Sequence, residues 1–331
     1  MKEYFEFDLE KELQVRNRKE YGVIHLAQRP NGSYINFPIM LVVGKNDGPV
    51  IVADACNHGD EFEGMEGILE TFGKLDPETM SGTFIGIPAV NMEAFAEGKR
   101  YNSIDLVPVD INRIYPGSPK GSMTAYITNW YAENILKKVD ALVTLHGGGT
   151  YTYIEPLALY TEGDSDVCRV EKELCELFGF KVMWANDYFE KGSGIQDEYM
   201  LEQNIPAICV EVGGQCTRLD KRELYASQIS EGLIKVMKYF KVLEGEVQKT
   251  EGLKYYHVDY VYVNEGGIVK NLKKANDSAK KGETLAIITN IFGEEIDRVI
   301  APCDCTVILH WTFPVCQPHS WIFLIGKPVE G

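Results

Sequence analysis

The sequence lacks any run of about 18 consecutive apolar residues, the length that a membrane-spanning helix requires. Residues 1–22 mix charged and apolar side chains and lack the uninterrupted apolar stretch of a signal peptide, which favours a cytoplasmic protein. Basic residues are fewer than acidic ones: the chain has 33 Lys and Arg and 49 Asp and Glu, which gives a net charge of −16. No local basic patch offsets this charge. A phosphate backbone would be repelled, so the composition argues against a nucleic-acid partner.

The cysteines do not form the dense framework of a small disulfide-rich secreted domain, which again favours a reducing cytoplasm. No G-x-G-x-x-G motif follows a predicted strand and opens a helix, so flavin and nicotinamide chemistry is disfavoured. Near the C-terminus, a second metal site built from Cys303, Cys305, Cys316 and His319 is conceivable. However, C-x-C without a matching partner pair is a weak zinc signature, so a metal site here is disfavoured. The eight thiols are at positions 56, 168, 175, 209, 216, 303, 305 and 316.

Short apolar runs alternate with stretches of helical period in the middle of the chain. This alternation is typical of an α/β protein in which helices cover a sheet, and we expect a mixed, mostly parallel sheet. The expected strands include residues 49–53, 83–87, 141–145, 181–184 and 207–211. The expected helices carry their apolar stripes within residues 62–72, 127–139, 167–178 and 220–240.

The pattern changes at both ends of the chain. Residues 1–45 have the alternation of strands and turns, with a hairpin signal at 29–32, and are expected to be a β-rich extension packed on the catalytic domain. Residues 46–240 are expected to form that catalytic domain, and residues 241–255 a linker with little apolar periodicity. Residues 256–331 contain short β-type runs separated by Gly, Asn, Asp and Pro, which predicts a small C-terminal all-β domain.

Three polar residues stand where predicted strands end. His58 follows the strand at 49–53 and precedes Glu61 by three residues, while His146 and Glu211 end two later strands. Ligands of open α/β sheets bind at the carboxyl ends of the strands. Two imidazoles and a carboxylate suit a catalytic zinc ion with one open position, and a further carboxylate can act as base. The alternative is structural, with Glu61 as a favourable charge at a helix N-terminus and His146 as a core residue.

Several motifs in a fixed order resemble those of the succinylglutamate desuccinylase and aspartoacylase family, which is similar in turn to zinc carboxypeptidases. They are HGDE at 58–61, Arg100, DINRIYPG at 110–117, LHGGG around His146 and EVGG at 211–214. The resemblance covers the chain from about residue 40 to the end. The N-terminal β region also resembles the subset that includes N-acetyl-diaminobutyrate deacetylase. The family implies a carboxypeptidase-like α/β domain and a C-terminal barrel-sandwich similar to biotinyl or lipoyl carriers, here without a lysine to modify near Cys303.

The resemblance also implies roles for individual residues. One Zn²⁺ per chain is expected on His58, Glu61 and His146, a general base at Glu211, an oxyanion-polarising group at Arg100, and a substrate-carboxylate clamp at Asn112 and Arg113. Arg113 has a planar fork of donors that suits a carboxylate. Two alternatives stay open, since Arg113 could instead pair with Asp110 or another acid, and Arg100 could be a solvated loop charge.

We therefore expect a zinc-dependent amidohydrolase that removes an acyl group from a small, carboxylate-bearing N-acyl amino acid or related amide. One alternative is a zinc carboxypeptidase that acts on short peptides. Another is a non-catalytic protein that binds a metal or ligand, although such a protein would have no need of a base at Glu211. The sequence does not identify the acyl group or the side chain of the substrate, and it is compatible with a homo-oligomer.

Overall fold

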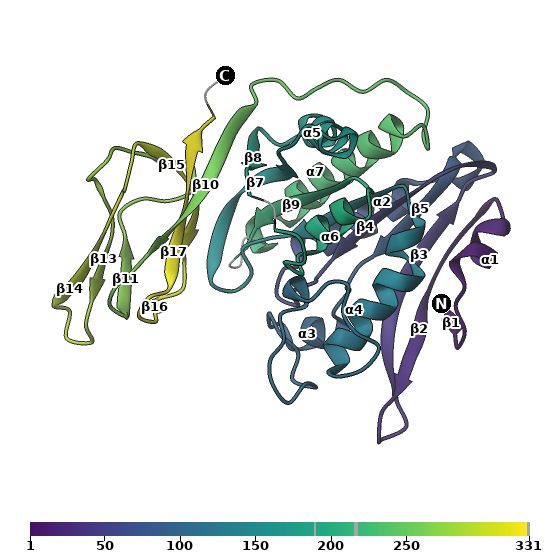
Figure 1. Cartoon of the computed structure of the whole chain (residues 1–331), viewed down its shortest axis with the longest axis horizontal. Helices are drawn as coiled ribbons and strands as arrows, with labels where there is room; N and C mark the ends of the chain where they lie inside the picture. The colour runs from purple at the N-terminus through teal and green to yellow at the C-terminus, as the bar shows by residue number, and fades with distance from the viewer. Residues whose placement is uncertain (189, 215–217, 330–331) are drawn as a thin grey trace.

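The computed structural model describes residues 1–188, 190–214 and 218–329. A helix-flanked sheet forms the larger part, and a smaller unit made of strands is attached to one end of it (Figure 1). Among the described residues, no helix combines the length and the apolar character needed to cross a bilayer.

One sheet contains thirteen strands of the described chain, in the order β1-β2-β3-β5-β4-β6-β9-β7-β8-β10-β17-β15-β12. The central strands β5, β4, β6 and β9 are parallel neighbours, whereas β2, β3 and β5 pair antiparallel, as do β9 and β7. The sheet is therefore mixed, and the mostly parallel arrangement expected from the sequence is not confirmed for the sheet as a whole. Its strands are β1 Lys2–Tyr4, β2 Arg18–Gln28, β3 Tyr34–Val43, β4 Asn46–Ala55, β5 Ser81–Ile87, β6 Ala141–His146, β7 Thr152–Thr161, β8 Val182–Asn186, β9 Ala207–Gly213, β10 Lys254–Tyr262, β12 Ser278–Ala279, β15 Cys305–Trp311 and β17 Trp321–Pro328.

Helices cover both faces of this sheet. Apolar side chains of α2, α5 and α7 pack on one face, where Ile68, Leu174 and Ile229 are buried against the strands. Side chains of α1, α4 and α6 pack with strand residues in a second core, which includes Tyr131 and Met200. The helices are α1 Leu9–Gln14, α2 Glu63–Lys74, α3 Met92–Glu97, α4 Met123–Asn134, α5 Asp166–Phe178, α6 Gln196–Glu202 and α7 Arg218–Tyr239, with short 3-10 turns at Pro77–Thr79, Ile111–Arg113 and Leu136–Lys138.

The five strands expected in the middle of the chain correspond to β4, β5, β6, β8 and β9, and the four helical stripes to α2, α4, α5 and α7. The hairpin signal at 29–32 lies between β2 and β3, where the Gly32 amide donates to the Arg29 carbonyl. The sequence did not predict β7. This strand contains Pro156, and a proline within an apolar run argues against a central strand because it cannot donate to the ladder.

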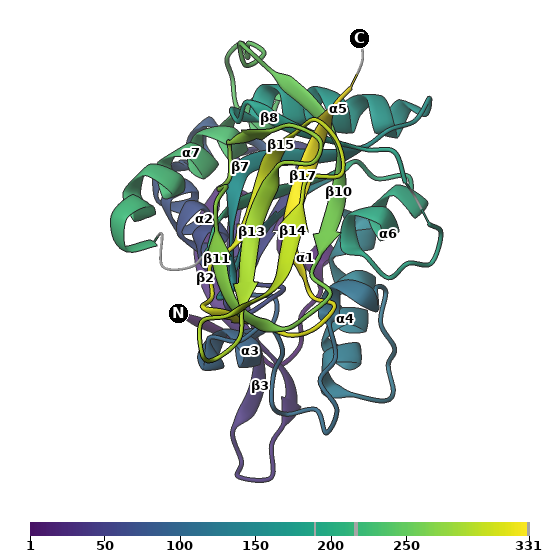
Figure 2. The same ribbon diagram turned by 90° about the vertical axis from the view of Figure 1, so that its left-hand side faces the viewer.

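The C-terminal β unit has a core between two sheets. A four-stranded sheet, β14-β13-β11-β16, packs against β10, β15 and β17 of the large sheet. Leu285, Val307 and Phe323 are fully buried between them. Figure 2 shows this unit in front, with its strands running lengthwise in the view and the rest of the chain behind it. The additional strands are β11 Gly267–Asn271, β13 Thr284–Thr289, β14 Glu295–Ile300 and β16 Val315–Cys316.

Candidate metal centre

Three neighbouring parallel strands carry the candidate site at their carboxyl ends. Strand β4 ends at Ala55, and the chain turns through Cys56 to place His58 above the sheet edge. His146 is the last residue of β6, and it pairs in register with Glu211 of β9. The order β4-β6-β9 thus brings together residues that are far apart in the sequence, as expected from the strand ends.

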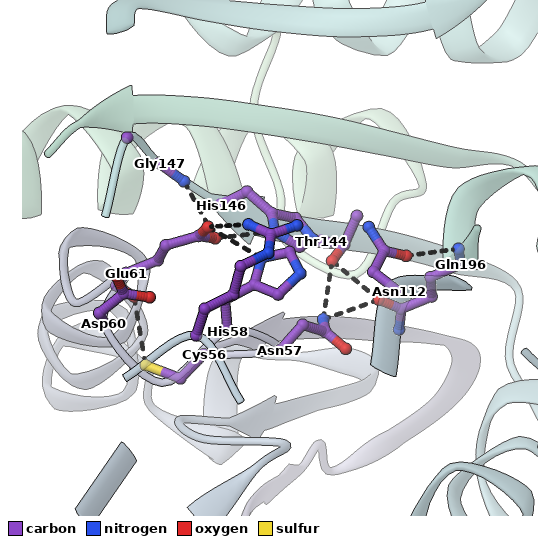
Figure 3. A network of polar contacts seen from close by, with 12 residues as sticks. Cys56, Asn57, His58, Asp60, Glu61, Asn112, Thr144, His146, Gly147 and Gln196 are labelled. Carbon is purple, nitrogen blue, oxygen red and sulfur yellow. Dashed lines mark hydrogen bonds and ion pairs between the residues drawn. The ribbon is translucent and has the colours of Figure 1, made fainter. Parts of the chain in front are cut away.

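Glu61 lies between the two histidines (Figure 3). Its Oε1 is 2.8 Å from Nδ1 of His58, and its Oε2 is 2.9 Å from Nδ1 of His146. One ligand atom from each residue lies within 4.8 Å of the other two, and all three side chains are buried. Two imidazole nitrogens and a carboxylate oxygen at this spacing match the donor set of a catalytic zinc site. The Glu61 side chain therefore points into the cluster. Glu61 precedes the first residue of α2 by two positions, so it is not part of that helix.

The three residues of this cluster shift one another's pKa values. Burial alone would raise the pKa of Glu61, yet the two imidazoles hold it well below its ordinary value. Burial would lower the pKa of His58, but Glu61 and Asp110 raise it, and Glu61 raises the pKa of His146 in the same way. The buried carboxylate thus favours positive charge around it. A divalent cation would satisfy the same requirement.

Asp110 is a member of this site that the sequence did not reveal as one. Its Oδ1 lies 3.0 Å from Nε2 of His58, and its Oδ2 accepts a 2.9 Å hydrogen bond from Nη2 of Arg100. Arg100 also lies 3.5 Å from Glu61. Asp110 therefore pairs with Arg100, and the alternative pairing with Arg113 does not occur. The position of Asp110 in the DINR segment, between the two arginines, was the available signal.

Glu211 faces the cluster from β9. Burial raises its pKa to about 8. The positive charges of His146 and Arg100 oppose this rise, and the negative charge of Glu61 adds to it. A carboxyl group with a pKa near neutrality can both accept and donate a proton. The register pair with His146 fixes its place beside the candidate ligand atoms of His58, Glu61 and His146.

Asn112 and Arg113 lie in the 3-10 turn that follows Asp110. The Oδ1 of Asn112 accepts a 2.8 Å hydrogen bond from the backbone amide of Gln196, and the side chain is buried. Arg113 is exposed, and its Nη1 donates to the carbonyl of Asn112. Within the described ranges of the chain, its guanidinium forms no salt bridge, although its charge opposes the rise in pKa that burial causes at Asp197 and Glu198.

The backbone beneath the ligands is closely packed. A Cβ atom added at Gly59 would lie 2.0 Å from the carbonyl carbon of Ala94, so only glycine lets the HGDE turn approach α3 this closely. The Sγ of Cys56 donates to the Glu61 carbonyl at 3.2 Å, and the Gly147 amide lies 3.3 Å from Oε2 of Glu61. These contacts fix both the start of α2 and the Glu61 carboxylate.

The C-terminal thiols do not form a second centre of this kind among the residues that the structure describes. Cys303, Cys305 and Cys316 are free thiols, as are the other described cysteines. Cys216 lies outside the described residues. The segment around Cys303 lies between β14 and β15.

Comparison with known proteins connects this geometry to a family. The profile described as "Succinylglutamate desuccinylase/Aspartoacylase catalytic domain" matches residues 47–240. The chain is 26% identical over 253 residues to the N-alpha-acetyl-L-2,4-diaminobutyric acid deacetylase of Halomonas elongata, covering 74% of this chain and 72% of that protein.

Solved structures share the whole architecture. The product-bound ectoine utilization protein EutE (DoeB) of Ruegeria pomeroyi has a TM-score of 0.84 at 21% identity, covering 95% of this chain and 96% of that one. A succinylglutamate desuccinylase/aspartoacylase from Rhodobacter sphaeroides has a TM-score of 0.84 at 21% identity, covering 96% and 97%. These identities establish the fold alone. Because the family profile spans more than half of its residues, the chain belongs to the succinylglutamate desuccinylase/aspartoacylase family.

Proposed function

We propose that this protein is a zinc-dependent cytoplasmic amidohydrolase that removes an acyl group from a small N-acyl amino acid. The observation that carries the proposal is the convergence of His58, Glu61 and His146 within 4.8 Å, with Glu211 next to His146 in the register of β9. Membership of a family named for amide deacylation supports the reaction class.

The residues present fit zinc. Both Nδ1 atoms face Glu61, and the far nitrogen of His58 faces a carboxylate, which is the outer contact that orients metal-binding histidines. We propose one ion per chain, held by His58, Glu61 and His146. Bound there, Zn²⁺ would supply Lewis acidity, which lowers the pKa of water and polarises a carbonyl group.

We assign proton transfer to Glu211. It would take a proton from the attacking water and return it to the nitrogen of the departing amine. The register pair of Glu211 with His146, which places its carboxyl group beside the proposed zinc ligands, supports this role.

We assign charge stabilisation to Arg100. Its side chain is 37% exposed, so the guanidinium is accessible to a substrate while Asp110 holds it in place. Negative charge develops on the carbonyl oxygen as the carbon becomes tetrahedral, and the loss of one donor to such an oxygen typically costs about 3 to 4 kcal/mol.

We assign recognition of the substrate carboxylate to Asn112 and Arg113. The fork of Arg113 forms no salt bridge within the part of the chain that the structure describes, so its donors can bind a ligand anion while Asp197 and Glu198 interact with its charge from a longer distance. An anchored carboxylate would hold the amide at a fixed distance from the reacting groups. The deacetylase relative acts, by its name, on N-alpha-acetyl-L-2,4-diaminobutyrate, and this compound is our first candidate substrate.

The test compares hydrolysis of N-acetyl-diaminobutyrate, N-succinylglutamate and N-acetylaspartate by the zinc-loaded wild type and by Glu211→Gln. We expect release of a free amine by the wild type and a loss of at least about 1,000-fold in kcat in the variant, with equal zinc content. Glu202→Gln, a change on the surface of α6, is the matched control and should retain activity. Equal rates for wild type and Glu211→Gln would refute the role of Glu211, and absence of any amide hydrolysis at full zinc occupancy would refute the proposed function.

A further inference from the structure

A buried polar network lies beneath the metal-ligand residues and connects β4 to the start of α6. Asp54 of β4 and Gln196, the first residue of α6, are both inaccessible to solvent. The Asp54 carboxylate accepts hydrogen bonds from Tyr131 Oη at 2.8 Å and from Gln196 Nε2 at 2.5 Å. Gln196 is thus attached by its side chain to the central sheet, 142 residues away in sequence.

The hydrogen bonds of this network fix the orientation of its side-chain amides. Because Nε2 of Gln196 faces the Asp54 carboxylate, its Oε1 faces the other way and accepts from Asn57 Nδ2 at 2.8 Å and from Thr144 Oγ1 at 3.0 Å. The Oδ1 of Asn57 in turn accepts from Tyr115 Oη at 2.8 Å. Each amide therefore has only one orientation that satisfies its neighbours (Figure 3). Asn57 and Thr144 lie one and two residues before His58 and His146.

The backbone of Gln196 connects this network to Asn112. Its amide donates to Oδ1 of Asn112 at 2.8 Å, as Figure 3 shows. Since a backbone N–H can pair only with the oxygen of the side-chain amide, the Nδ2 donors of Asn112 must point away from α6. Within the described ranges of the chain, these donors have no protein acceptor. Together with Arg113, they present only N–H groups, which suits an anionic oxygen of a ligand.

We propose that Gln196 is a positioning residue, which holds the start of α6 through Asp54 and so fixes the Asn112 amide with its donors toward the substrate carboxylate. This inference rests on the proposed function, because it assumes that Asn112 binds that carboxylate. It predicts that the Gln196 side chain controls carboxylate recognition without touching the substrate. A purely structural network would affect stability alone.

The experiment uses the zinc-loaded full chain and two probes, N-acetyl-L-2,4-diaminobutyrate and its methyl ester. For Gln196→Met, which keeps the length of the side chain but removes its hydrogen bonds, we expect KM for the free acid to rise about tenfold, the loss of one hydrogen bond to a charged group. The KM for the ester should change less than twofold, and kcat and zinc content should be retained.

Tyr131→Phe is the matched control, because it removes another hydrogen bond to Asp54 without affecting α6. It should lower the melting temperature while leaving the acid-to-ester ratio of KM unchanged. If Gln196→Met fails to fold, Gln196→Asn provides the same comparison with a shortened amide, and its ratio should shift in the same direction.

An unchanged acid-to-ester ratio in a folded Gln196 variant would overturn the positioning role, and so would an equal shift of that ratio in Tyr131→Phe. If the wild type itself does not distinguish acid from ester, the proposed carboxylate clamp at Asn112 and Arg113 fails instead. The two failures are therefore separable.

Discussion

The Nε2 atom of His58 lies 3.0 Å from Oδ1 of Asp110, while Nδ1 of the same ring faces Glu61. A neutral imidazole carries one proton, so a ring that donates Nε2–H to Asp110 leaves Nδ1 free to bind a cation. Asp110 is itself held by Arg100. The pair therefore connects a proposed metal ligand with a proposed catalytic arginine.

Asp110→Ala should weaken zinc binding by about 10- to 100-fold, because His58 loses the carboxylate that sets its orientation and its tautomer. Competition titration with a chromogenic zinc chelator measures this affinity. Glu97→Ala is a suitable control, since this carboxylate bonds Ser103 in the neighbouring loop and contacts no imidazole. Equal zinc affinity in Asp110→Ala and in the wild type would rule out this role.

Zinc should stabilise the folded protein through its buried ligands. An ion that binds only the folded state at 100 times its Kd adds about 2.7 kcal/mol to the free energy of unfolding. We expect the melting temperature to rise on zinc addition, to fall again with chelator, and to be insensitive to zinc in His146→Ala. His257→Ala, which alters a histidine bonded to Glu162 away from the site, should respond as the wild type does. A zinc response retained in His146→Ala would argue against the proposed centre.

The loop after the HGGG segment packs on the C-terminal β unit. Tyr151 stacks on Trp311 with ring centroids 5.5 Å apart and planes inclined by 15°, and the Tyr151 carbonyl accepts from the Thr312 amide at 2.8 Å. Trp311→Ala should destabilise this contact by roughly 1 kcal/mol beyond the lost burial. Because the loop follows His146, we expect KM to rise while zinc content is unchanged.

Phe292→Ala is the aromatic control for this change, because Phe292 is 85% exposed at a hairpin of the same unit. Steady-state kinetics and thermal unfolding of both variants make the comparison. Matching behaviour of the two would show that the stacked pair has no part in shaping the site.

Stability should also fall with rising pH because of Glu171, which is buried in α5. Burial raises its pKa to about 8, against the hydrogen bonds that it accepts from the Ala207 and Thr161 amides. The unfolded chain releases this proton first as the pH rises, so the contribution of Glu171 is fully present in acid and is lost on the way to about pH 8. One such group changes the free energy of unfolding by about 1.4 kcal/mol per pH unit in that window.

Urea denaturation between pH 5 and 8 measures this slope. Glu171→Gln should have a flatter dependence than the wild type, whatever its absolute stability. Glu173→Gln, an exposed position on the same helix, should keep the wild-type slope. Parallel pH dependences of Glu171→Gln and the wild type would contradict the assignment.

The sequence predicted that His58, Glu61 and His146 would come together in the candidate metal centre, because two of these residues follow strong strand signals. His58 follows one apolar run, and His146 and Glu211 end two others. The parallel order of β4, β6 and β9 then brings these residues together at the carboxyl ends of the strands. The outer contacts had no such signal. The position of Asp110 between two arginines was a signal, but it did not indicate that Asp110 pairs with Arg100 and His58 rather than with Arg113.

Long-range polar contacts were also beyond prediction. Gln196 meets Asp54 and Asn112 across 142 and 84 residues, from a helix of only seven residues. Such a short helix has too few turns for an apolar stripe to reveal it. The sequence predicted a mixed sheet, but it did not reveal how many of the strands pair antiparallel, because strand direction depends on connections that periodicity does not report.

The single sheet that joins both parts of the molecule has a mechanical consequence. Strand β10 pairs with β8, and β15 pairs with β7, so backbone hydrogen bonds tie the C-terminal strands directly to the larger part. A carrier domain must move on a flexible linker, but this β unit is held to the larger part by strand pairing and cannot move as a separate body. If the chain were cut within 240–253 and the two fragments were separated, each fragment would expose unpaired strand edges. We therefore expect the fragments to reassociate or aggregate rather than behave as independent proteins.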